Sequence, residues 1–310
     1  MEDKVQGIDL TKKRGSIVFF DKLGFSLTFI SAIILIITTA SIYIFVASKG
    51  FATFFVNGVN IIDFLTGTEW NPLRTAEEGG PLYGTFPFIF GSFAVTFMAA
   101  LISAPLGIGA AVFMTEIAPS WGQKILQPVI ELLVGIPSVV YGFIGLTLVV
   151  PFIRNYVGGL GFGLLAGTIV LAVMILPTIT SISVDTLRAV PREMKEGSYA
   201  LGATRWQTIY RILFRASIPG FITAVVFGMA RAFGEALAVQ MVLGNAPLIP
   251  KDLVSPASTI TSIITINMGH TVSGSAENNV LWSLALLLLA MSALFIFVIR
   301  MIAKRRRFTS

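Results

Sequence analysis

The sequence predicts an all-α polytopic membrane protein with six transmembrane helices. Of its 310 residues, 55% are hydrophobic and only 12% are charged, whereas an ordinary soluble domain carries about 25% charged residues. Uncharged apolar stretches recur six times along the chain, and about 20 such residues cross the hydrocarbon core as a helix. The basic residues gather on alternate sides of these stretches, as they do in a chain that crosses a membrane repeatedly.

The expected spans are separated by charged or glycine-rich segments. The first lies between Lys22 and Lys49. We expect it to remain as an uncleaved anchor, because its apolar region is too long for a signal peptide and no small-residue cleavage site follows it. The six expected spans are residues 23–48, 87–114, 132–153, 155–184, 217–243 and 280–299.

The distribution of Lys and Arg predicts the orientation. Most of the 22 basic residues lie before the first span, between the second and third, between the fourth and fifth, and after the sixth. Cytoplasmic loops carry such an excess, so both termini are expected in the cytoplasm. The chain then divides into a cytoplasmic N-terminal segment at residues 1–22, a transmembrane domain at residues 23–303 and a basic cytoplasmic tail at residues 304–310.

Composition excludes several kinds of chemistry. The chain has no cysteine and one histidine, His270, so it lacks thiolate sites, and the histidine alone cannot form a metal site or a catalytic dyad. No Gly-Lys pair occurs, so there is no Walker phosphate-binding loop, and we expect no ATP hydrolysis by this chain. We expect no catalytic residue, metal or cofactor. The net charge of +6 does not indicate nucleic acid, because the basic residues follow the topology.

Prolines occur near the middle of three consecutive spans, at Pro105, Pro137 and Pro177. Each removes a backbone hydrogen bond and kinks its helix, which is tolerated where neighbouring helices or water satisfy the freed carbonyl. The fourth span also has glycines at GxxxG spacing, which permit close helix approach: Gly159, Gly163 and Gly167. We expect the second, third and fourth spans to pack in the interior. The alternative is that the prolines only shape the helices.

Two long loops, residues 50–86 and 244–279, lie on the expected outer side. Loops of this length are usually functional or disordered, and the first contains prolines, a tryptophan and an excess of acidic residues. We interpret them as a docking surface for an extracytoplasmic partner. The alternative is a folded plug that seals the outer face.

A charged pair, Arg231 and Glu235, lies within the fifth span. In a continuous helix, residues four apart share one face. A central arginine costs about 2.5 to 3.5 kcal/mol on insertion, so we expect the pair to face a packed interior or a water-filled path. Arginine binds oxyanions bidentately and keeps its charge. Glu235 would neutralise it, or accept a hydrogen bond from a protonated oxyanion and so select phosphate over sulfate. The alternative is a structural salt bridge.

Residues 191–219 form the longest patterned polar passage between apolar stretches. They predict two short helices, 192–201 and 203–214, joined by a turn at Gly202, where glycine tolerates backbone angles that other residues resist. The second helix would continue into the span that begins near Ser217. We interpret the segment as a docking element outside the bilayer that passes force into the membrane. The alternative is an ordinary amphipathic loop.

This segment resembles the EAA loop of binding-protein-dependent ABC importer permeases. The resemblance is carried by Glu196, Gly197, Ser198, Gly202 and Ile212, followed by a proline at position 219. Gly-Ser replaces the usual Ala-Ala, and the proline comes later than in the family. The resemblance implies the type I ABC importer permease fold, with coupling helices at about residues 191–215 that contact a separate ATPase through these five residues.

Further motifs resemble the phosphate-specific, PstC-like members of that family. They are WNP at 70–72, YGTFPFIFGS at 83–92, PLGIGAAVF at 105–113, GIPSVVYGFIGL at 135–146 and ARAFGEALAVQMVLGN at 230–245. The arginine and glutamate implicated in transport in that family fall on Arg231 and Glu235, and Glu131 also has a counterpart. The resemblance implies a phosphate-importer permease in the cell inner membrane, with a PstA-like sister permease, two ATP-binding subunits and an extracytoplasmic phosphate-binding protein.

Other functions are weighed against this one. The chain could be a permease for another oxyanion, or the PstA-like sister subunit. It could also be an ion-coupled secondary transporter, although we find no inverted repeat and no chain of intramembrane acids. A membrane scaffold that senses phosphate without moving it is a further alternative.

Overall fold

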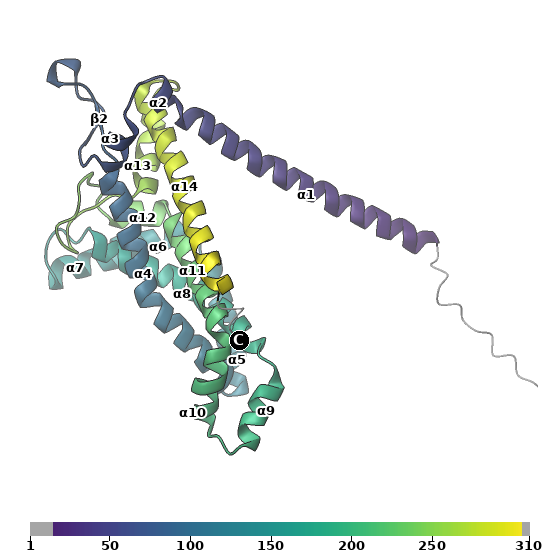
Figure 1. Cartoon of the computed structure of the whole chain (residues 1–310). Helices are drawn as coiled ribbons and strands as arrows, with labels where there is room; N and C mark the ends of the chain where they lie inside the picture. Colours follow the sequence, from purple (N-terminus) through teal and green to yellow (C-terminus); the bar gives the residue numbers. More distant parts are fainter. Residues whose placement is uncertain (1–14, 306–310) are drawn as a thin grey trace, which may run out of the picture.

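The computed structural model describes residues 15–305, which form a bundle of helices (Figure 1). In this part of the chain, six helical segments are long and apolar enough to cross a membrane: Phe19–Phe55, Phe86–Ile117, Ser138–Tyr156, Leu164–Arg188, Arg205–Phe233 and Ala276–Phe297. The predicted all-α fold with six spans is therefore confirmed. The expected N-terminal segment and basic tail lie largely outside the described residues.

The first half of the chain contains three spans, with a small hairpin between the first two. Its elements are α1 (Gly15–Gly50), α2 (Ala52–Phe55), α3 (Ile61–Thr66), β1 (Trp70–Asn71), β2 (Leu82–Tyr83), α4 (Phe86–Val112), α5 (Ser120–Gly135), α6 (Ser138–Ile144) and α7 (Val150–Tyr156). The two strands pair antiparallel, with Trp70 opposite Tyr83. A π-helical turn, Phe113–Ile117, extends α4, and another, Gly145–Val149, joins α6 to α7.

The second half contains the central helix and the last two spans. Its elements are α8 (Leu164–Arg188), α9 (Arg192–Ala200), α10 (Arg205–Thr208), α11 (Phe214–Phe233), α12 (Leu237–Val242), α13 (Ile260–Asn267) and α14 (Ala276–Arg305). A π-helical turn, Ile209–Leu213, makes α10 continuous with α11. Below, the end of the bundle that carries β1 and β2 is called the hairpin end, and the end that carries α9 and α10 is called the α9 end.

Helix α1 leaves the bundle at an angle (Figure 1) and exposes most of its apolar side chains. Only its last turns pack against the rest of the bundle. The rings of Phe45 and Trp282 meet edge to face with their centroids 5.2 Å apart, and the Ser283 hydroxyl donates to the Gly50 carbonyl. Because its own backbone hydrogen bonds are internal, such a helix is stable in lipid, where its exposed apolar surface carries no penalty.

The main core lies around α8, which packs against α4 and α11. Gly107 of α4 and Gly228 of α11 both approach the side chain of Ile179. These glycines let the three helix backbones come close together. The expectation of an interior position is confirmed for the second and fourth spans. The third, α6 to α7, also contributes buried residues to this core, Tyr141 and Ile153 among them.

The third and fourth spans differ from those predicted. The helix expected at 132–153 is interrupted at Ile136 and Pro137, which adopt extended backbone angles. The residue before proline disfavours the helical region, so a break replaces the expected kink. The fourth span begins at Leu164 rather than 155, because the preceding glycines, Gly159 and Gly163 among them, adopt positive φ in a loop. Only Gly167 of the predicted GxxxG series lies in a helix, where it contacts Leu243.

The core packing makes a prediction with an internal control on α4. A Cβ at Gly107 would lie 3.0 Å from Ile179 Cγ2, whereas a Cβ at Gly109 would meet no atom within 4 Å. We expect Gly107→Leu to lower the melting temperature of the detergent-solubilised chain, because overpacking costs about 1 to 3 kcal/mol. Gly109→Leu should leave it unchanged or raise it through helix propensity, by up to about 1 kcal/mol. Tryptophan fluorescence measures the melting temperature. Equal melting temperatures for the two variants would contradict a close α4–α8 contact.

Candidate functional site

The fifth span is interrupted within the bundle. The helix predicted continuously over 217–243 ends at Phe233, and α12 begins only at Leu237. Phe233 is buried against Phe93, at 5.4 Å between ring centroids, and stacks on Phe295 at 6.2 Å. Gly234 follows at the helix end. The aromatic contacts therefore hold the end of α11 against α4 and α14.

The interruption frees backbone groups, and neighbouring side chains bond them. The Thr261 hydroxyl of α13 donates to the Glu235 carbonyl at 2.7 Å. The Glu235 carboxylate accepts the Ala238 N–H through Oε1 at 3.1 Å and so caps the start of α12. A break inside a membrane helix is tolerated where protein groups re-satisfy the backbone in this way.

Arg231 lies in the last turn of α11 and is partly buried. Its Nη1 donates to the hydroxyl of Thr178 on α8 at 3.0 Å. A guanidinium carries five N–H donors, and Thr178 occupies one of them. The fixed positive charge and the remaining donors suit an anion.

The structure corrects the expected relation between Arg231 and Glu235. Because the helix ends between them, they do not stand one turn apart on a single helix, and within residues 15–305 no ion pair joins them. The structural salt bridge considered from the sequence is therefore absent from this part of the chain. Glu235 serves the backbone of α12, while Arg231 bonds α8.

Sequence reasoning missed Thr178 and Thr261, the two hydroxyls that hold this region together. Thr178 directly follows Pro177 in the middle of an apolar span, which was a usable signal. Thr261 lies in the loop expected at 244–279, and nothing in the sequence pattern indicated that this loop forms α13 and reaches Glu235.

The 191–219 segment is built as predicted. Helices α9 and α10 are joined through Gly202, whose φ of +81° lies in the left-handed region that favours glycine. Thr204 and Gln207 form a reciprocal capping box at the start of α10. From there the helix continues into α11 without a gap. The predicted turn and its continuity with the fifth span are confirmed.

A groove of about 520 Å³ lies between α9 and α10. It collects four of the five predicted contact residues in its lining: Gly197, Ser198, Gly202 and Ile212. Glu196 is exposed on α9 but does not line the groove. Leu201, which also lines the groove, is 90% exposed, and Trp206 of α10 is 66% exposed. Clustered exposed apolar groups of this kind mark interaction surfaces.

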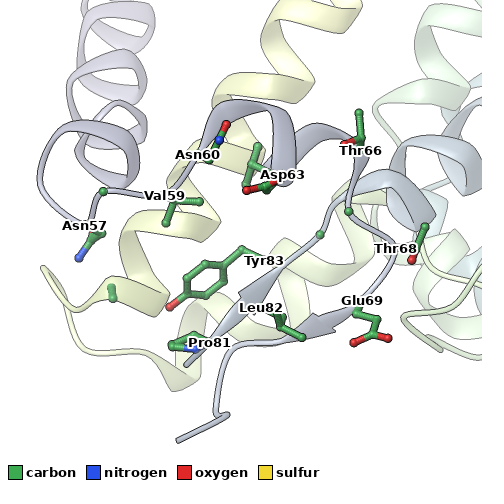
Figure 2. A pocket seen from close by; sticks show the side chains of 15 residues that line it. Asn57, Val59, Asn60, Asp63, Thr66, Thr68, Glu69, Pro81, Leu82 and Tyr83 are labelled. Atoms are coloured by element: carbon green, nitrogen blue, oxygen red, sulfur yellow. The ribbon is translucent and has the colours of Figure 1, made fainter. Parts of the chain in front are cut away.

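A second hollow, of about 660 Å³, lies at the hairpin end (Figure 2). Asn57, Asn60, Asp63, Glu69 and Tyr83 line it, from the α2–α3 loop, α3 and the hairpin. Burial, and less strongly the Glu277 carboxylate, raises the pKa of Tyr83, so the phenol keeps its proton. The hollow therefore offers carboxylates and neutral polar groups, which suit a positively charged or polar partner.

Comparison with known proteins identifies relatives over most of the chain. The family model "Binding-protein-dependent transport system inner membrane component" matches residues 103–308. The probable ABC transporter permease protein YqgH of Bacillus subtilis is 62% identical over 277 residues, 89% of this chain and 88% of that protein. The phosphate transport system permease protein PstC of Mesorhizobium japonicum is 34% identical over 262 residues, 78% of each chain.

Solved structures agree with this fold. The inward-facing MetNI methionine ABC transporter matches with a TM-score of 0.56 at 20% identity, covering 70% of this chain and 93% of that one. A bacterial ABC transporter involved in import of the acidic polysaccharide alginate matches with a TM-score of 0.63 at 14% identity, covering 94% and 98%. At such identities the likeness concerns the fold alone.

The α9–α10 turn makes a prediction with two glycines of opposite role. Gly202→Ala places a Cβ on a residue at φ +81°, which costs about 1 to 2 kcal/mol. Gly197 lies within α9, and a Cβ added there would meet no atom within 4 Å. Gly197→Ala should therefore stabilise the helix by up to about 1 kcal/mol. We expect faster amide hydrogen exchange across α9 and α10 in the first variant and slower exchange in the second. The same change in both would contradict the assigned turn.

Proposed function

This chain belongs to the family of binding-protein-dependent transport system inner membrane components, and from that membership we propose that it is the PstC-like permease subunit of an ATP-driven phosphate importer. It is an ABC importer permease with six candidate membrane spans and the type I permease fold. The relatives named PstC, at 31 to 34% identity, support phosphate.

The observation that carries the proposal is Arg231 at the break in the fifth span. The guanidinium keeps its charge at any physiological pH and matches an oxyanion bidentately. In this chain it belongs to the interrupted helix α11, and its only hydrogen-bond partner within the described residues is Thr178 of α8. Phosphate that reaches this point would find an uncompensated positive charge with free donors.

Glu235 would supply the selectivity. Its Oε1 is engaged by the Ala238 N–H, which fixes the carboxylate and leaves Oε2 as an acceptor. Phosphate near neutral pH retains an O–H that can donate to such an oxygen, whereas sulfate has none and would meet only repulsion. This role needs no contact between Glu235 and Arg231; it needs both to lie along the path of the anion.

The groove between α9 and α10 would receive the ATPase. We propose that Glu196, Gly197, Ser198, Gly202 and Ile212 belong to this contact, with two ATP-binding subunits serving this chain and a PstA-like sister permease. We propose that the α9 end and both termini lie in the cytoplasm, because the positive-inside bias favours that orientation. Movement of α9 and α10 would pass along the continuous helix into α11 and so to Arg231.

The hairpin end would then face outward, toward an extracytoplasmic phosphate-binding protein. The hollow around Asp63 and Glu69 is a polar surface on that side (Figure 2). Its carboxylates repel a free anion, so we propose that it receives polar or basic side chains of the binding protein rather than phosphate itself.

Uptake measurements test the anion site. Arg231→Lys keeps the charge but loses the planar fork. Losing one charge-assisted hydrogen bond, about 1.5 to 3 kcal/mol, corresponds to phosphate uptake that is lower by about 10-fold or more. The assay is uptake of radiolabelled phosphate by cells without another phosphate importer. Arg154→Lys, at an exposed arginine of α7, is the control and should transport normally. Normal uptake by Arg231→Lys would remove the guanidinium from the proposal.

The selectivity role of Glu235 has its own measurement. Glu235→Gln keeps an oxygen that can cap the Ala238 N–H but removes the negative charge. We expect the preference for phosphate over sulfate to fall by about 10-fold, the value of one charge-assisted hydrogen bond. Competition of sulfate with labelled phosphate measures it. A preference identical to that of the parent protein would rule this role out.

Co-purification tests the ATPase contact. Tagged chain from its native host, purified in mild detergent, should retain an ATP-hydrolysing subunit. Glu196→Lys reverses an exposed charge in the proposed contact, and a like-charge juxtaposition costs several kcal/mol, so retention should fall by about 100-fold or more. Asp185→Lys, an exposed acid on α8 outside the groove, should retain the subunit. Phosphate uptake by the purified chain alone, driven by an ion gradient, would instead establish a secondary transporter.

A further inference from the structure

Glu116 is a buried carboxylate in the π turn that ends the second span. Its side chain is 8% exposed, although aspartate and glutamate are almost never buried without a partner. A carboxylate shielded from water is strongly destabilising unless it is paired and hydrogen-bonded. Its position at the α9 end, outside the Arg231 region, gives it no part in the anion site.

Both helices of the 191–219 segment bond to this one residue. The Lys195 ammonium of α9 forms an ion pair with the Glu116 carboxylate, and an Nη of Arg205 in α10 donates to the Glu116 backbone carbonyl. Lys195 lies 79 positions after Glu116 in the sequence, and Arg205 lies 89 positions after it. Glu116 thus forms polar contacts from the end of α4 to both helices, next to the apolar cluster in which Met114 packs with Ile209 and Leu213.

The end of a helix is a favourable place for such a tie. The last carbonyls of a helix lack internal partners, and the helix C-terminus carries partial negative charge. The helix made by α4 and its π turn ends at Ile117, so the Glu116 carbonyl and carboxylate present negative charge together. Two cations, Lys195 and Arg205, satisfy both. Removing the carboxylate would leave Lys195 attracted only by the helix end.

Helices α9 and α10 are themselves joined by a hydrogen bond between Ser198 and Thr208, 2.9 Å apart. They are also linked covalently to two core helices, to α8 through residues 189–191 and to α11 through the π turn. Glu116 adds α4, which has no covalent link to them. The three helices that meet at Ile179 are therefore all attached to the same small unit.

We propose that Glu116 is the positioning residue that makes α4 move together with α9 and α10, so that displacement of these two helices reaches the anion site through α4 as well as through α11. This inference rests on the proposed coupling of the α9–α10 groove to an ATPase. Unlike the groove, Glu116 lies outside the proposed ATPase contact, and it adds α4 as a second helix that carries the movement.

The test uses the complete transporter reconstituted in liposomes, with phosphate uptake and ATP hydrolysis measured on the same sample. Glu116→Gln keeps the size and the backbone carbonyl but removes the charge. We expect ATP hydrolysis and subunit retention to persist, while phosphate imported per ATP falls by about 2- to 30-fold, the range seen for residues that carry coupling between sites. Asp185→Asn, an exposed acid on α8, is the matched control and should leave the ratio unchanged.

A double-mutant cycle separates a specific pair from general destabilisation. Lys195→Met should lower the ratio as Glu116→Gln does, and the two together should be no worse than either alone, because the pair acts as one unit. Lys195→Arg keeps the charge, so phosphate imported per ATP should stay close to the value of the parent protein. An unchanged ratio in Glu116→Gln, or losses that multiply in the double variant, would overturn the proposal.

A distance measurement does not depend on what is transported. Because the chain has no cysteine, Phe113→Cys in the π turn and Leu201→Cys between α9 and α10 can be spin-labelled selectively; the parent side chains are 46% and 90% exposed. In the purified full-length chain, Glu116→Gln should broaden the distance distribution, and Asp185→Asn should not. A distribution as narrow as that of the parent would overturn the tie between α4 and α9, whereas a failure of the parent complex to import phosphate would concern only the proposed function.

Discussion

The permanent charge of Arg231 within an apolar span is the constraint that the surrounding structure satisfies. A guanidinium cannot escape burial by losing its proton, so the protein must provide polar partners or a path to water. Thr178 of α8 provides one hydrogen bond, and the helix that carries Arg231 stops two residues later. A straight apolar helix would offer neither free backbone nor space beside the charge. The break is thus part of the same arrangement as the arginine.

Breaking a helix in this environment has its own requirements, and the loop at the hairpin end meets them. Thr261 bonds the freed Glu235 carbonyl, and the N–H of Ile260, at the start of the same short helix, is held by Ser92 of α4 at 3.0 Å. The close approach of Gly91 to the Ser258 carbonyl brings this segment against α4. The long loop expected from the sequence as a docking surface or a plug therefore also completes the transmembrane interior.

The sequence predicted the parts of this protein that local physics decides. Apolar length predicted six spans, and Gly202 between two polar helical stretches predicted a turn, which the structure shows with a φ of +81° at that glycine. Apolarity measures the cost of transfer to lipid, however, and says nothing about helix continuity. For that reason the interruption after Phe233 was missed. The partners of the charged groups were missed for another reason: Thr178 lies 53 positions from Arg231, and Lys195 lies 79 from Glu116, so only the packed fold brings them together.

These long-range contacts explain how movement at one end can alter a site in the middle of the bundle. Arg231 belongs to α11 and its hydroxyl partner to α8, so any shift of one helix along the other changes that hydrogen bond. The glycine contacts at Ile179 are close, and close-packed helices slide or rotate as units more readily than they deform. A unit attached to α4, α8 and α11 together can change their relative positions, whereas one attached to a single helix would mainly bend it. Because α9 and α10 are attached to all three helices, their movement can change the position of the Arg231 guanidinium relative to α8 and so its access to the anion.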